Sequence, residues 1–333
     1  MLEAPPDLTA ELILATLREH WGLAATEAEY AAIGHGSHNW TVRTDDGTKL
    51  FVKADRAEPA FRESAHQTAA ELRDGGLDSV HAAIRSRSGE LRRQVGPWKL
   101  TVFPFINGRN PDFADSAQRC RIAETIGRLH SCPPMPNAPR WAPGLWRPEL
   151  DRLMAAGLDA PWDSGPYAAR AQALFLAGLP GVRELLELHD SLSARLAASD
   201  QAWVITHGEP HGGNTMLDDS GQLRLIDCDD LMVAPRERDL WLLLYVAHDR
   251  RRADDDSEIL RAYQRTAGPA APRRDVIELI RADWHLSEIS AYVHDFSRPH
   301  HDTEDHAAHW RTLNSYLPVS QNWPPSPGRF SEI

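Results

Sequence analysis

The segment that most restricts the fold of this chain is a short hairpin between two polar side chains. Two apolar runs, residues 215–217 and 223–226, flank an Asp-Asp-Ser-Gly turn, a pattern that predicts two antiparallel strands. Asn214 stands immediately before the first strand, and Asp227 stands immediately after the second. Because the outer ends of a hairpin lie side by side, this pairing brings an amide oxygen next to a carboxylate. Oxygen ligands of this kind suit Mg²⁺, so the sequence predicts a magnesium site there.

A carboxylate on the loop before the hairpin completes the candidate site. Glu209 lies five residues before Asn214, where it could receive the proton of a hydroxyl group. The order of an acid, four residues, an asparagine and a later aspartate resembles the catalytic and metal-binding loops of the aminoglycoside phosphotransferase family, which are relatives of protein kinases. The resemblance implies that Asn214 and Asp227 bind the metal and that Glu209 takes the catalytic acid position. The family usually has aspartate where this chain has Glu209, which carries one more methylene group.

Further segments resemble the spectinomycin phosphotransferase-like branch of that family. They are residues 227–230 and 234–240 and, more weakly, 283–289 and 296–300. The resemblance implies an α+β, protein-kinase-like fold with two lobes. The N-lobe would be a small antiparallel sheet, and the larger C-lobe would be mostly helical.

The predicted elements agree with a two-lobed chain whose boundary falls near residue 104. Antiparallel strands are predicted over residues 29–33, 39–44, 49–54 and 98–103. A helix is predicted over about 59–73, between the third and fourth of these strands. Residues 1–104 then form the N-lobe, and residues 105–333 form a C-lobe with the catalytic loop, the metal site and the acceptor pocket. Within the C-lobe, the stretch 132–161 is rich in proline and tryptophan and is expected to be irregular.

A lysine on the third predicted strand is the candidate contact for the nucleotide phosphates. Phe51 and Lys53 lie on the same face of this strand, because alternate residues point the same way. Lys53 can then neutralise the α- and β-phosphates, as the strand lysine of kinases does. Glu63 is our choice for the helix carboxylate that orients Lys53, and Glu71 is its rival.

Two other segments are expected to contact the nucleotide. Gly36, in a Gly-x-Gly turn with Gly34, is a candidate for the phosphate loop, although such glycines more often only shape a turn. By analogy with kinases, backbone groups near Phe103 and Phe105 are expected to contact the adenine ring. ATP is the expected phosphoryl donor, with GTP as the alternative.

The composition and net charge of the chain limit the classes of partner and the cellular location that we expect. The chain has 333 residues and a net charge of −12, and no nucleic-acid partner is expected because phosphate backbones require basic patches. No apolar run approaches the ~20 residues of a membrane helix. The N-terminal segment has no basic region of the kind that begins a signal peptide. Three cysteines without metal or redox spacing fit a reduced, cytoplasmic setting. A monomer or a dimer is expected.

The acceptor is expected to be a small molecule that is cationic or polyhydroxylated. The negative charge of the chain suits a cationic substrate, although a solubilising surface explains that charge equally well. Candidate acceptor contacts are Asp229, Asp230, Trp284 and Glu288. The first two are also candidates for a second metal contact or a helix cap.

These observations together predict an ATP-dependent phosphotransferase that acts on the hydroxyl of an aminoglycoside-like or aminocyclitol-like antibiotic. One alternative is a biosynthetic or metabolic kinase of a sugar, a nucleoside or an amino alcohol. A second alternative, suggested only by Glu209, is a pseudokinase that binds a nucleotide without transferring its phosphate.

Overall fold

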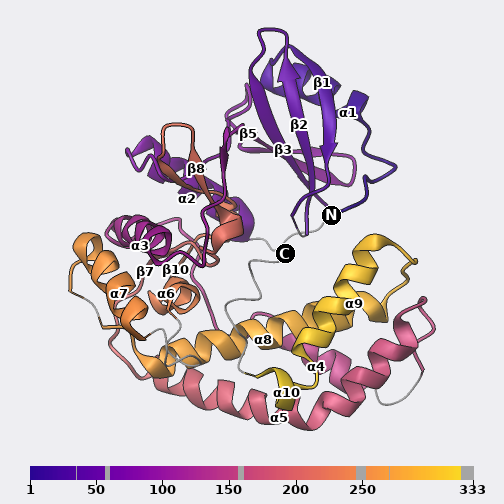
Figure 1. Cartoon of the computed structure of the whole chain (residues 1–333). Coiled ribbons are helices and arrows are strands. Elements are labelled where there is room, and N and C mark those ends of the chain that lie inside the picture. The colour runs from indigo at the N-terminus through magenta and orange to yellow at the C-terminus, as the bar shows by residue number, and fades with distance from the viewer. Residues whose placement is uncertain (35, 57–60, 157–160, 245–252, 270, 324–333) are drawn as a thin grey trace. The chain divides into compact units, whose positions relative to one another are not determined.

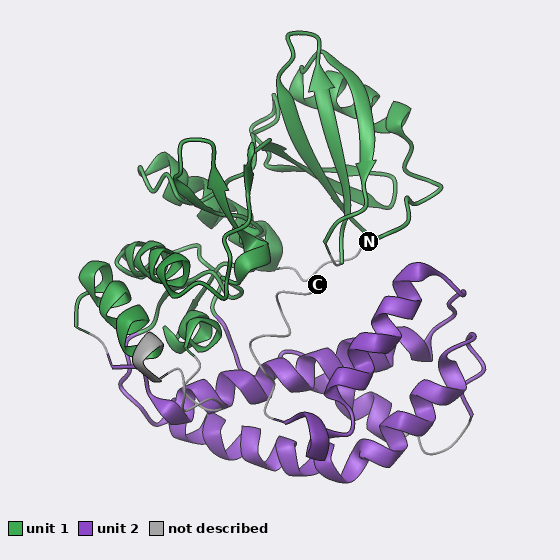
Figure 2. Ribbon diagram, in the orientation of Figure 1, with its two compact units in different colours: residues 1–140, 203–270, 328–333 green, residues 141–202, 271–327 purple. Residues whose placement is uncertain are grey.

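The chain forms two compact units in a computed structural model that describes residues 1–34, 36–56, 61–156, 161–244, 253–269 and 271–323 (Figure 1). The first unit comprises residues 1–140, 203–270 and 328–333, and the second comprises residues 141–202 and 271–327 (Figure 2). These units do not follow the lobe boundary predicted near residue 104, which stays a prediction.

An antiparallel sheet dominates the N-terminal part of the first unit. In the described residues it has five strands in the order β1-β2-β3-β5-β4. The strands are β1 (Ala25–Ala31), β2 (His38–Thr44), β3 (Lys49–Asp55), β4 (Arg92–Val95) and β5 (Trp98–Pro104). The helix α2 (Phe61–Asp74) lies between β3 and β4 in the chain. The predicted small sheet with one inserted helix is therefore confirmed.

The alternation of side chains along β3 explains how the sheet positions its lysine. Leu50, Val52 and Ala54 are buried on one face, in a core that also contains Ile13 of α1 (Ala10–Thr16). Phe51 and Lys53 are half-buried on the other face. Because strand side chains alternate, burying the apolar set fixes Lys53 on the opposite side of the sheet.

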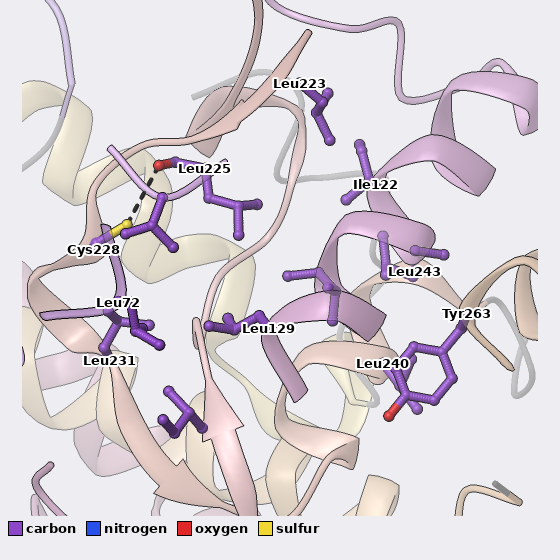
Figure 3. Close-up of a cluster of buried hydrophobic side chains, with 14 of the residues drawn as sticks. Leu72, Ile122, Leu129, Leu223, Leu225, Cys228, Leu231, Leu240, Leu243 and Tyr263 are labelled. Atoms are coloured by element: carbon purple, nitrogen blue, oxygen red, sulfur yellow. Dashed lines mark hydrogen bonds between the residues drawn. The ribbon is translucent and has the colours of Figure 1, made fainter. Parts of the chain in front are cut away.

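Short strands and helices complete the first unit. The strands are β6 (Gly108–Arg109), β7 (Val204–Thr206), β8 (Thr215–Asp218), β9 (Leu223–Leu225) and β10 (Met232–Ala234). The helices are α3 (Ser116–His130), α6 (Glu237–Leu243) and α7 (Ala253–Ala267). Figure 3 shows the apolar core they share, in which Ile122 and Leu129 of α3 lie near Leu225 of β9 and Leu240 of α6. This core packs the apolar side chains of β8 and β9 against α3, α6 and α7, and this close packing holds the hairpin in place.

The second unit is helical throughout its described elements. These are α4 (Arg147–Ala156), α5 (Ala168–Ala197), α8 (Arg274–Ser297), α9 (Glu304–Tyr316) and α10 (Val319–Asn322). The expectation that residues 132–161 are irregular was wrong for α4. Pro148 is the second residue of that helix, where its missing N–H costs no intrahelical hydrogen bond. Among the described residues, no helix combines the length and apolar character that crossing a membrane would require.

Candidate active site

The β8–β9 hairpin forms as the sequence predicted. Thr215 pairs with Leu225 at the open end of the hairpin, and the Ile226 N–H donates a 3.0 Å hydrogen bond to the Asn214 carbonyl. Asn214 ends the 3₁₀ turn Gly212–Asn214, and Asp227 follows Ile226 directly. The pairing therefore carries Asn214 and Asp227 to the same end of the hairpin.

Asp227 has an unusual backbone conformation. Its φ of 60° and ψ of 48° place it in the left-handed region, where it is the one non-glycine residue with positive φ in the described part of the chain. Such a conformation costs of order 1–3 kcal/mol and persists only where the surrounding structure enforces it. The left-handed turn redirects the chain into the 3₁₀ turn Cys228–Asp230, so three acidic residues gather within four positions.

Lys53 of β3 reaches this acidic turn. Its Nζ forms an ion pair with Oδ1 of Asp227 and lies 2.9 Å from Oδ2 of Asp229. Burial alone would lower the pKa of Lys53, but the carboxylates of Asp227, Asp229 and Asp55 outweigh it and raise that pKa above its usual value. Lys53 is therefore held as a cation at the end of the hairpin.

Glu63, the helix carboxylate predicted to orient Lys53, contacts two other cations in this structure, and its role toward Lys53 stays a prediction. Glu63 lies near the start of α2, where its Oε2 is 3.5 Å from Nζ of Lys99 and 3.9 Å from Arg92, and its side chain is 55% exposed. The rival, Glu71, accepts a hydrogen bond from Gln67 instead. The rotation of α2 decides this outcome, because neighbouring residues on a helix point in different directions.

Asp230 is also paired with a cation of the chain. It forms an ion pair with Arg238 of α6, which also donates to the Asp230 carbonyl at 3.2 Å and to Oγ1 of Thr206 at 3.1 Å. Burial raises the pKa of Asp230 to about 6, against the effect of Arg238. This side chain ties the acidic turn to α6, and its contact with an acceptor stays a prediction.

The loop that carries Glu209 is fixed by Asp239 of α6. Its carboxylate is fully buried and accepts hydrogen bonds from the His207 N–H at 2.8 Å, the Gly208 N–H at 2.6 Å and His130 Nε2 at 2.9 Å. Burial would raise the pKa of Asp239, but the hydrogen bond and charge of His130 outweigh it and lower the pKa. Asp239 thus supports the loop that carries Glu209.

His207 links this loop to the hairpin. Its Nδ1 accepts a 3.3 Å hydrogen bond from the Glu209 N–H, which leaves Nε2 to donate to the Ile226 carbonyl at 2.8 Å. The ring is buried, so its role is to join the residue that carries Glu209 to the residue before Asp227. Glu209 itself is more accessible, with 36% of its side chain exposed, and lies 3.8 Å from Nε2 of His211.

Replacing Asp239 with alanine is expected to lower the free energy of unfolding by about 3–5 kcal/mol, because three buried donors lose their acceptor. Urea unfolding followed by tryptophan fluorescence measures the change. Asp219, an exposed carboxylate on the hairpin turn, provides the matched control and should tolerate alanine. If Asp239→Ala lowered the free energy of unfolding by less than about 1 kcal/mol, the range of an exposed ion pair, Asp239 would not be the residue that supports the Glu209 loop.

The structure shows the surroundings of the remaining predicted nucleotide contacts. Gly36 has a φ of 79° beside the β1–β2 turn, a conformation that favours glycine. Phe103 is buried with its ring stacked on His81, at 5.5 Å between centroids. The Phe105 N–H donates to the Lys49 carbonyl at 3.2 Å, so this N–H is already used within the sheet. Contacts of these residues with an adenine ring stay predictions.

The predicted acceptor contacts Trp284 and Glu288 belong to the second unit. Both lie on α8, and Nε1 of Trp284 donates a 3.0 Å hydrogen bond to the hydroxyl of Tyr316 on α9. Burial and the charge of Glu288 raise the pKa of Tyr316. The two predicted residues therefore share one tyrosine, and their contact with an acceptor stays a prediction.

Sequence reasoning missed several residues that hold the site together. Asn110 clamps the loop by donating from Nδ2 to the carbonyls of Gly212 at 2.9 Å and Thr215 at 3.0 Å. Arg62 of α2 lies 3.3 Å from Asp229. Arg238 fell within the segment 234–240 that resembles the family, yet nothing in that pattern identified its partner. The partners of Asn110 and Arg62 lie more than a hundred residues away in sequence and leave no local signal.

The donor set at the hairpin end fits a divalent cation. An amide oxygen at Asn214 and a carboxylate at Asp227 are hard ligands, and Mg²⁺ prefers few protein oxygens together with phosphate and water. Burial raises the pKa of Asp227, and the neighbouring Asp229 carboxylate adds to the effect, against Lys53. A cation would relieve this crowding of negative charge.

The chain is similar to a protein of known sequence and to several solved structures. Protein StrN of Streptomyces griseus is 25% identical over 299 residues, which cover 85% of this chain and 84% of that protein. The structure is similar to that of the spectinomycin phosphotransferase APH(9)-Ia in complex with ADP and spectinomycin. The TM-score is 0.70 at 17% identity, covering 93% of this chain and 94% of that chain.

A second solved structure has the same fold. It is the microcompartment-associated aminopropanol kinase, with a TM-score of 0.61 at 15% identity over 91% of this chain and 94% of that chain. These likenesses confirm the predicted kinase-like fold. The model of the phosphotransferase enzyme family, called APH, matches residues 29–276, which include β3, α2, the Glu209 loop and the hairpin. The match extends over most of the 333 residues, and this chain belongs to the phosphotransferase enzyme family.

Proposed function

We propose that this enzyme transfers the γ-phosphate of ATP to a hydroxyl group of a small aminocyclitol-like or aminoglycoside-like molecule. The observation that carries the proposal is the contact of Lys53 with Asp227, because it brings the strand lysine to the hairpin end that also bears Asn214. Enzymes that transfer phosphoryl groups place a lysine that binds the phosphates close to oxygen ligands that bind the metal.

Each residue has a defined part in this proposal. Lys53 binds the phosphates of the nucleotide, and Asn214 and Asp227 would hold Mg²⁺. When bound, the metal supplies positive charge that neutralises the phosphate oxygens. Glu209 orients the acceptor hydroxyl and accepts its proton, a task for which its partly exposed carboxylate is accessible. His207 and Asp239 keep the Glu209 backbone in position through the hydrogen bonds described above.

Two arguments support a cationic, polyhydroxylated acceptor. The chain carries a net charge of −12, which favours the approach of a cation. A protein of the same fold, the spectinomycin phosphotransferase, was crystallised with ADP and spectinomycin. Trp284 and Glu288 on α8 are our candidate contacts for such an acceptor.

A metabolic kinase of an amino alcohol is the second candidate. The aminopropanol kinase of the same fold supports it, and its acceptor would also be a small amine with a hydroxyl group. The two candidates share the transfer chemistry and differ in the size of the acceptor.

A mass-shift screen tests the proposal directly. The full-length protein is incubated with Mg·ATP and single acceptors from two sets, aminocyclitols with aminoglycosides and small amino alcohols, and products are examined for an added phosphoryl group. Phosphorylation within the first set is expected. Phosphorylation confined to the second set would replace the first candidate with the second. Binding of Mg·ATP without transfer to any acceptor would indicate a pseudokinase, and no binding of Mg·ATP would overturn the proposal altogether.

A further inference from the structure

The side chain of Lys53 has a second carboxylate partner besides Asp227. Its Nζ lies 2.9 Å from Oδ2 of Asp229, whose side chain is only 7% exposed. Lysine is a flexible point charge, so a fixed partner is needed to hold it ready for a phosphate group. Asp227 cannot serve this purpose alone if it also binds the metal, since a divalent cation would compete with Lys53 for its oxygens.

Asp229 is held in turn by an arginine. Nη1 of Arg62, the second residue of α2, lies 3.3 Å from the same Oδ2 that contacts Lys53. Two cations from separate elements thus converge on one nearly buried carboxylate. A buried charge is tolerated only when it is paired, and removing a partner is costly. The three side chains therefore depend on one another.

Arg62 is also linked, through Asp55, to Ser37 beside the turn that contains Gly36. Its Nη1 lies 3.9 Å from Oδ1 of Asp55, the last residue of β3. The Ser37 hydroxyl donates to that oxygen, and Arg92 of β4 lies 3.3 Å from the other oxygen of Asp55. Arg62 therefore joins α2 directly to the acidic turn after Asp227 and, through Asp55, to the end of β3.

Resting on the function proposed above, we propose that Asp229 is the carboxylate that orients Lys53 toward the nucleotide and that Arg62 fixes Asp229. Both are positioning residues. The first turn of α2 directs a cation toward the site through Arg62, while Glu63 faces Lys99 and Arg92. The orienting carboxylate is thus supplied by the turn after the metal ligand and not by the helix.

Nucleotide binding by the full-length protein tests this assignment without any acceptor. Titration calorimetry with ATP is run in Mg²⁺ and again in EDTA on Arg62→Gln, Arg62→Lys, Asp229→Asn and Glu63→Gln. Arg73→Gln, an exposed arginine in the last turn of α2, is the matched control. Thermal melts establish that each variant is folded.

We expect Arg62→Gln and Asp229→Asn to weaken ATP binding about tenfold, both with Mg²⁺ and in EDTA, because a misplaced Lys53 contacts the phosphates poorly in either case. Arg62→Lys should restore most of the affinity, whereas Glu63→Gln and Arg73→Gln should stay within about twofold of the unaltered protein. If Arg62 and Asp229 only stabilised the fold, their variants would melt at a lower temperature but would bind ATP as tightly as the unaltered protein.

Two results would overturn the assignment. Weaker ATP binding in Glu63→Gln with normal binding in Arg62→Gln would return the orienting role to the helix carboxylate. A defect of Asp229→Asn that occurs with Mg²⁺ but vanishes in EDTA would make Asp229 a metal ligand. Either result leaves the proposed kinase function standing, while failure of the unaltered protein to bind Mg·ATP would overturn that function itself.

Discussion

Replacing Asp227 with asparagine is expected to lower kcat by about 10³-fold, because the change removes the negative charge of the carboxylate proposed to hold the metal together with Asn214. Asparagine keeps the size of the side chain and is among the residues that best tolerate the left-handed backbone at this position, where φ is 60°. The variant should therefore fold, and the loss should be one of chemistry. A coupled assay of ADP release with a productive acceptor measures it across a range of Mg²⁺ concentrations.

The control for this change is Asp219→Asn. Asp219 lies on the turn of the same hairpin, exposed and at the far end from Asp227. It should retain the activity of the unaltered protein at every Mg²⁺ concentration. If Asp227→Asn kept more than about a tenth of kcat, the metal site at this hairpin end would be refuted, since a metal ligand is worth several kcal/mol to the transition state.

Replacing Glu209 with glutamine is expected to lower kcat by about 10²- to 10⁴-fold, the range in which general bases contribute. The glutamine has the same shape but cannot accept the proton of the acceptor hydroxyl. The affinity for Mg·ATP should be unchanged, because Glu209 is not proposed to contact the nucleotide. Steady-state kinetics together with ATP titration separates the two effects, and Glu184→Gln on the exposed face of α5 serves as the control.

Glu209→Asp gives a sharper test of the extra methylene group. Because the backbone is anchored by His207 and Asp239, shortening the side chain withdraws the carboxylate by ~1 Å, and a shift of that size can cost about 10²-fold. An intermediate loss is therefore expected. Unchanged turnover in Glu209→Gln would remove this residue from the mechanism and leave phosphoryl transfer to positioning and charge alone.

Much of the site was predictable because its pieces are local. The turn between residues 218 and 221 dictates how β8 and β9 pair, and that pairing puts Asn214 and Asp227 at one end. The alternation of apolar residues in β3 likewise fixes the face of Lys53. Both depend on periodicity within a few residues, which the sequence displays directly.

Features that depend on tertiary packing were harder to predict. Glu63 was chosen as the partner of Lys53 from its distance along the chain, but the rotation of α2 turns it toward Lys99. The helix α4 was missed because a stretch rich in proline was expected to be irregular, whereas Pro148 occupies the second position of this helix, where it is tolerated. The role of Arg62 could not be predicted, because its partner Asp229 lies in a distant segment of the sequence.

The sequence by itself therefore determined the kinase-like sheet, the hairpin and the set of side chains at its open end. The tertiary structure alone decided which remote charges meet: Lys53 with Asp229 and Arg62 with Asp229. The physical reason is that strand pairing and helix periodicity act over a few residues. Ion pairs between remote segments depend on the packing of a whole core, which fixes the rotation of each helix.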